Sequence, residues 1–89
     1  MKKLSAIAAD IARAALSPPE PVYWVGEVPE RCDICNKRVI TTFVDARTRS
    51  GSWGNLDLQC HRIHGVGTGK GKGQTYHLQG DGRWLKIAG

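Results

Sequence analysis

The residues of this chain whose types and spacing most directly indicate chemistry are its three cysteines. Cys32 and Cys35 are separated by two residues, and Cys60 stands later in the chain, just ahead of two histidines. Zinc binds thiolate and imidazole ligands in a tetrahedral arrangement, and two ligands spaced in this way are typical of one half of such a site. We therefore expect the three thiols to hold a structural Zn²⁺ ion.

The fourth ligand of this zinc site stays open among three residues. His64 lies four residues past Cys60, so one helical turn would bring both to the same ion, and imidazole suits a structural zinc better than a carboxylate. Asp57 stands three residues before Cys60, where a second pair of cysteines would have its first member. His61 is adjacent to Cys60 and would point away from the metal. We expect His64, with Asp57 as the alternative.

Other uses of the cysteines fit the sequence less well. An odd number of thiols argues against a disulfide framework, and a thioredoxin-type pair would need a βαβ context that does not surround Cys32. Catalytic zinc needs an open coordination position and a nearby base, and nothing in the spacing of Asp57 or Glu30 demands that role. A nuclease of the HNH type would need a central histidine, and residues 36–56 contain none. We expect no enzymatic activity.

The sequence around these ligands predicts mostly β-strands. Residues 39–44 and 53–58 predict one hairpin between the two halves of the metal site, and residues 75–78 and 83–87 predict a second, with Asp-Gly in its turn. Asn36 follows the second thiol at a position where a turn often needs a left-handed residue. The expected fold is a small, mostly-β, zinc-ribbon-like module of two hairpins joined by zinc, with an N-terminal α-helix.

That helix is expected over residues 4–16, and it gives the chain a division into three parts. Residues 1–17 form the helix, 18–30 a proline-rich linker and arm, and 31–89 the zinc-ribbon-like domain. A helix of this length is marginal alone in water, so its apolar stripe should dock on this domain or on another molecule. Leu4, Ile7 and Ile11 are the candidate contact residues of this stripe.

The chain has 89 residues and a formal net charge of +5, so it is one small domain with a basic surface. Residues 61–89 hold five lysines and arginines against Asp81 alone. Such an excess favours an acidic partner, either nucleic acid or an acidic protein surface. The glycine- and lysine-rich segment 65–74 does not match a P-loop, because each lysine is followed by glycine; it is a cationic loop or a solvated connector. The candidate basic contacts are Arg62, Lys70, Lys72, Arg83 and Lys86.

Targeting signals are weak in this sequence. The apolar run near the N-terminus is interrupted by Asp10 and Arg13 before it reaches the length of a secretory signal. No run approaches the roughly 20 apolar residues of a membrane span. We expect a protein that is not secreted and has no membrane partner.

Five short segments together resemble a family of uncharacterised small zinc-ribbon-like proteins of tailed phages and prophages. The segments are Cys-Asp-Ile-Cys-Asn at 32–36, Thr-Phe-Val-Asp at 42–45, Gly-Ser-Trp-Gly at 51–54, Cys-His at 60–61 and Gly-Lys-Gly-Gln-Thr-Tyr at 71–76. The likeness covers roughly residues 31–89, and it implies a phage origin and zinc. This chain has Asp57 where the family tends to carry the first cysteine of its second pair.

Two functions follow as expectations. In the first, the protein is a virion accessory, a capsid cement or decoration protein whose apolar helix docks on capsid subunits. In the alternative, it is a zinc-ribbon protein that binds nucleic acid or regulates the host through its basic residues. The protein is then expected in the virion or in the host cytoplasm.

Overall fold

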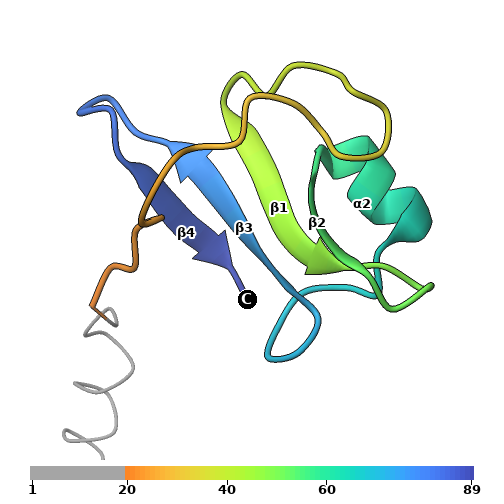
Figure 1. Ribbon diagram of the computed structural model, residues 1–89. Helices are drawn as coiled ribbons and strands as arrows, with labels where there is room; N and C mark the ends of the chain where they lie inside the picture. Colours follow the sequence, from red (N-terminus) through yellow and green to blue (C-terminus); the bar gives the residue numbers. More distant parts are fainter. Residues whose placement is uncertain (1–19) are drawn as a thin grey trace, which may run out of the picture.

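The computed structural model describes residues 20–89, so the helix expected over residues 4–16, with Leu4, Ile7 and Ile11, lies outside the described part. The described residues form one antiparallel sheet of four strands and one short helix (Figure 1). The order across the sheet is β2-β1-β3-β4. The elements are β1 (Thr42–Arg47), β2 (Trp53–Leu56), α2 (Leu58–His64), β3 (Gly73–Leu78) and β4 (Trp84–Ala88).

The mostly-β character expected from the sequence is confirmed. The two hairpins are joined edge to edge in one sheet and are not separate units. β1 pairs with β2 and β3 pairs with β4, as the turn signals predicted, and β1 also pairs with β3 along its length. The first hairpin is shorter than predicted: its second strand ends at Leu56, because Asp57 caps a helix. The helix that the structure describes therefore follows β2.

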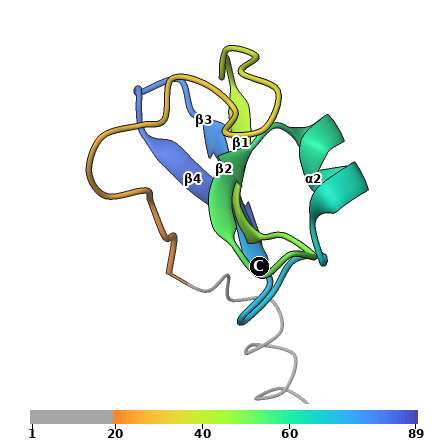
Figure 2. The same cartoon turned by 45° about the vertical axis from the view of Figure 1, so that its right-hand side comes forward.

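Alternation along β1 gives the sheet two different buried faces. Val44 and Ala46 point to the side of α2 and pack with Leu56 and two of the cysteines. Phe43 points to the opposite side, where it stacks on Tyr76 with ring centroids 5.4 Å apart. Figure 2 shows α2 on one side of the sheet and the segment before residue 30 on the other.

The second face is covered by the arm that precedes the metal site. Trp24 makes edge-on contacts with Phe43 and Tyr76, with centroids 5.1 and 5.2 Å away. The arm also lies along β4, since Trp24 N donates to Trp84 O at 2.9 Å and Lys86 N donates to Val22 O at 2.7 Å. The segment 22–25 thus packs along β4 as part of the arm, with an isolated bridge between Tyr23 and Leu85.

The opposite edge of the sheet is protected by the loop that carries the first two cysteines. Asp33 N donates to Asn55 O at 2.9 Å, and Asn55 N donates to the Asp33 carboxylate at 2.7 Å. An unpaired edge strand invites pairing with other chains, and these two bonds engage the middle of β2. They also fix the loop against the sheet, next to the end of β2 where Asp57 follows.

Trp24→Ala is expected to lower the free energy of unfolding by about 3 kcal/mol, because it removes the ring that closes the aromatic face. Urea unfolding of the purified protein measures this loss. Trp53→Ala is the matched control, since the Trp53 side chain is 54% exposed and should change stability little. Equal losses for the two variants would show that the arm does not cover a core.

Candidate metal centre

The structure brings four candidate ligands together in one cluster. The sulfurs of Cys32, Cys35 and Cys60 and a carboxylate oxygen of Asp57 all lie within 4.8 Å of one another. In a tetrahedral zinc site, Zn–S bonds of about 2.3 Å place neighbouring ligand atoms about 3.8 Å apart. The cluster therefore has the size of a site for one ion, and the three thiols converge as their spacing predicts.

The first two thiols are positioned by a tight turn. Cys32 N donates to Lys37 O at 2.8 Å, and Asn36 N donates to Cys32 O at 3.0 Å. Asn36 closes this turn with φ of 62°, the left-handed conformation that its position predicted and that asparagine tolerates. The turn folds Cys35 back beside Cys32. The Cys32 side chain is buried and Cys35 is exposed, so one ligand anchors the core while the other lies at the surface.

The second half of the cluster comes from the junction of β2 and α2. Asp57 is the N-cap of α2, and its Oδ1 accepts a hydrogen bond from Cys60 N at 2.6 Å. Its other oxygen, Oδ2, accepts from Cys35 Sγ at 2.8 Å. Aspartate is a favoured N-cap because its side chain satisfies a free N–H of the first turn. The same carboxylate thus starts the helix and faces the thiols.

His64, the fourth ligand favoured by the sequence, is not brought into the cluster. Helical side chains tilt toward the helix N-terminus, so Cys60 points back to Asp57 and away from the next turn. His64 is exposed at the end of α2, where its carbonyl accepts from Arg49 N at 2.9 Å. The alternative ligand, Asp57, occupies the place that His64 was expected to take.

His61 also lies outside the cluster, and it holds the glycine-rich loop. Its Nε2 is 2.9 Å from Gly67 O, and Gly65 N donates to His61 O at 2.8 Å. A Cβ at Gly65 would collide with the His61 ring, so only glycine allows the chain to pass this close to α2. The imidazole of His61 therefore positions the segment that leads from α2 into β3.

The thiols of the cluster differ in their electrostatic surroundings. Burial acts to raise the pKa of Cys32, but the N–H groups of Cys35, Asp57 and Ile34 outweigh it, and the pKa lies below its ordinary value. Burial and the neighbouring thiols and carboxylate raise the pKa of Cys60 to about 12. Hydrogen bonding to Asp57 raises the pKa of Cys35. A bound cation is what would let these groups be anionic together.

The donor set fits zinc. Thiolates are soft ligands that select zinc over magnesium and calcium, which prefer oxygen. Three sulfurs and one carboxylate oxygen complete a four-coordinate site made of protein atoms alone. Such an ion would be held by Cys32, Cys35, Cys60 and Asp57, and it would tie the loop before β1 to the start of α2.

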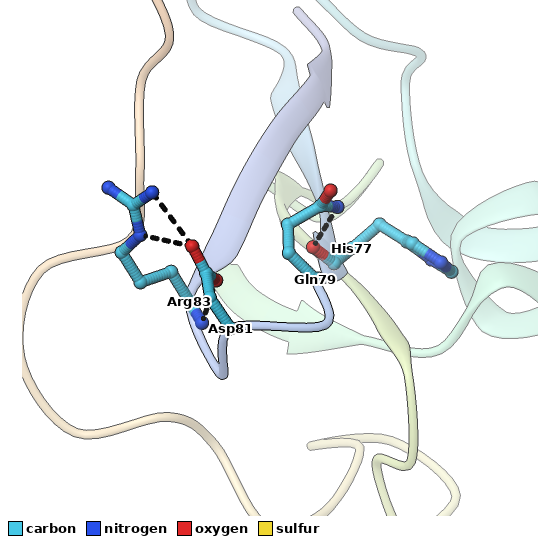
Figure 3. Close-up of polar contacts among 4 residues, drawn as sticks. All are labelled: His77, Gln79, Asp81 and Arg83. Carbon is cyan, nitrogen blue, oxygen red and sulfur yellow. Dashed lines mark hydrogen bonds and ion pairs between the residues drawn. The ribbon is translucent and has the colours of Figure 1, made fainter.

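The basic residues expected to bind a partner do not form one surface. Arg83 is engaged within its own hairpin, where its guanidinium pairs with the Asp81 carboxylate at 2.8 Å (Figure 3). The same guanidinium lies over the Tyr23 ring of the arm, 4.0 Å from its centroid. Figure 3 also shows Gln79 of the same turn donating to the His77 carbonyl. Lys86 Nζ donates to Gly89 O at 3.1 Å. Arg83 and Lys86 belong to the β4 side of the molecule.

Arg62 lies on α2, and Lys70 and Lys72 lie in the glycine-rich loop. Arg47 and Arg49, which the sequence did not mark as binding residues, lie near that loop and the end of α2. Arg47 N donates to Lys72 O, and Arg49 N donates to His64 O, each at 2.9 Å. These bonds place the end of β1 beside the glycine-rich loop and the end of α2. Arg47 and Arg49 flank a threonine in a turn rich in hydroxyl side chains, and that pattern is the signal by which they could have been found.

Comparison with known proteins adds no family: no family model, curated protein or solved structure matches this chain. Among the described residues, no helix is long and apolar enough to cross a membrane.

Asp57→Ala is expected to weaken zinc binding by more than about tenfold, because it removes a ligand and also the N-cap that orients Cys60. His64→Ala should leave zinc affinity unchanged. Competition with a chromophoric chelator measures both. Asp57→Asn separates the two roles, since asparagine keeps the cap but is a poorer ligand. Loss of zinc in His64→Ala alone would contradict the assignment of Asp57.

Proposed function

We propose that this protein is a zinc-stabilised binding module without enzymatic activity. The observation that carries the proposal is the closed cluster of Cys32, Cys35, Cys60 and Asp57. Catalytic zinc sites commonly have three protein ligands and keep the fourth position for water or substrate. Here four side chains from the protein are available to one ion, and a filled tetrahedron favours a structural role.

The size of the core supports the same proposal. On the side of α2, the buried apolar cluster consists of three aliphatic side chains and two of the cysteines: Val44, Ala46, Leu56, Cys32 and Cys60. So few methyl groups stabilise a sheet weakly, and small domains commonly add a metal or a disulfide. With zinc bound, the two cysteines become part of a rigid cross-link under β1.

The larger role that we propose is docking on an assembly, most specifically as a capsid cement or decoration protein of a phage. The resemblance of segments within residues 31–89 to phage zinc-ribbon-like proteins supports this proposal. Exposed apolar side chains support it as well, because Val25 is 90% and Ile40 72% exposed. Such a protein would be located in the virion, or in the host cytoplasm before assembly.

Removal of the metal tests the structural role. Native mass spectrometry should find one zinc per chain, and EDTA should abolish the near-ultraviolet circular dichroism of the packed tryptophans, since metal-binding energy is here folding energy. Addition of zinc should restore the signal. Reduced protein that holds no metal, or that keeps its fold in EDTA, would contradict the proposal.

Purified particles test the docking role. Mass spectrometry of virions of the phage that encodes the chain should detect this protein in stoichiometric amounts. Val25→Ser and Ile40→Ser should reduce its incorporation with unchanged zinc content, and Glu20→Gln is the control, at an exposed charge. Absence of the protein from intact particles would rule out a virion component.

A further inference from the structure

The end of β1, the end of α2 and the start of β3 lie together in the lower part of Figure 1, and the segments there carry five exposed cationic residues. We call this surface the cationic end. The segments that form it, 46–56 and 61–73, contain no aspartate and no glutamate. Its members are Arg47, Arg49, Arg62, Lys70 and Lys72.

Backbone hydrogen bonds hold three separate segments together at the cationic end. The turn after β1 is bonded to the last residue of α2 through Arg49 and to the glycine-rich loop through Arg47, as described above. Thr48 and Gly65 also form an isolated β-bridge. The loop itself turns tightly, since Lys72 N donates to Gly69 O at 2.9 Å. The clustering of charge is therefore built into the fold.

These cations have no carboxylate partners in the part of the chain that the structure describes. Between residues 20 and 89 the ion pair found is that of Arg83 with Asp81, on the hairpin of β3 and β4. Unneutralised charges that lie close together repel one another and attract polyanions. Counterions neutralise these exposed groups in solution, and a polyanion that binds here would gain affinity by releasing them.

A hollow of about 240 Å³ lies beside the cationic end, and Arg49 lines it together with three hydroxyl side chains that can bind phosphate. A guanidinium and hydroxyl groups donate hydrogen bonds to phosphate oxygens, and backbone phosphates are contacted in this way in nucleic-acid complexes. Hydroxyls of Thr48, Ser50 and Ser52 lie within 3.2 Å of one another. The lining residues are Ile34, Thr48, Arg49, Ser50, Ser52 and His64.

An exposed aromatic ring stands at the same end of the sheet, on the face away from α2, because its partner Arg47 alternates with Ala46. Trp53 directly follows Ser52, pairs with Arg47 across the two strands, and is 54% exposed. The other two tryptophans pack against Phe43 in the aromatic face. A free indole beside cationic groups is the combination by which proteins bind single strands, because each base offers a face for stacking.

We propose that the cationic end binds single-stranded nucleic acid, with phosphates on Arg47, Arg49, Arg62, Lys70 and Lys72 and one base stacked on Trp53. An unpaired strand is favoured over a duplex because the faces of paired bases are already stacked on their neighbours. It is favoured over an acidic protein surface because a base can stack on the exposed Trp53 indole, whereas an acidic side chain has no ring that could do so. This role stands apart from the proposed docking role, and its failure would leave the zinc and virion measurements unchanged.

Fluorescence anisotropy with a labelled 12-nucleotide oligothymidylate and the zinc-loaded full chain tests the proposal. If each of the five cations contacts one phosphate, affinity should fall roughly 130-fold between 50 and 200 mM salt. Quenching of tryptophan fluorescence should accompany binding. No binding at 50 mM salt, or tighter binding of a duplex of equal length, would overturn the proposal.

Variants then locate the site. Arg49→Gln and Lys72→Gln should weaken binding and each reduce the salt slope by about 0.7. Trp53→Ala should weaken it roughly tenfold with the slope unchanged, and Trp53→Phe should retain most of the affinity. Arg83→Gln is the matched control, because it removes an arginine from the other side of the molecule, and it should bind as the parent does.

Two results from the variants would count against the site. A loss in Arg83→Gln equal to that in Arg49→Gln would mean diffuse attraction to net charge. Heparin that binds as tightly as the oligonucleotide, with no effect of Trp53→Ala on either, would mean a general polyanion surface. Zinc content and circular dichroism are measured for each variant, so that a loss of binding is scored on folded protein.

Discussion

The convergence of two chain segments on one cluster of thiols is the interaction on which the rest of the structure depends. The Asp57 carboxylate is at its centre, because one oxygen caps α2 at Cys60 and the other faces Cys35. The loop that carries Cys32 and Cys35 is tied in turn to β2 through Asp33. Loss of the cluster would therefore also loosen the edge of the sheet at β2 and the start of α2.

The sheet separates two small cores that are stabilised in different ways. One is aliphatic and is completed by the cysteines; the other is aromatic and is completed by Trp24 from the arm. Neither is as large as the core of a bigger domain. Each is covered by a segment that precedes the sheet in sequence, and Cys60 of α2 adds to the aliphatic one. The cysteine cluster and the arm thus cover opposite faces of the sheet, against which one helix packs in the part of the chain that the structure describes.

The same geometry decides which charges are available for binding. A basic residue with a nearby carboxylate or carbonyl is already engaged, as Arg83 and Lys86 are on the side of β4. Where β1 ends, the segments 46–56 and 61–73 meet, and both contain basic but no acidic residues. Net charge alone does not distinguish these groups. Their positions do, since Arg83 and Lys86 have partners within the protein, whereas the residues of the cationic end have no carboxylate partner in the part of the chain that the structure describes.

The sequence by itself determined the mostly-β fold, the two hairpins, the left-handed Asn36 and the convergence of the three thiols, because these follow from local periodicity, turn chemistry and spacing. The pairing of β1 with β3, the cover supplied by Trp24 and the place of Arg47 and Arg49 were decided by the tertiary structure, since they join residues far apart in the chain. The fourth position of the metal cluster was decided there too. Ligand preference favoured His64, but the N-cap geometry of α2 turns Cys60 back toward Asp57, and the direction of a helical side chain outweighs the chemistry of the donor.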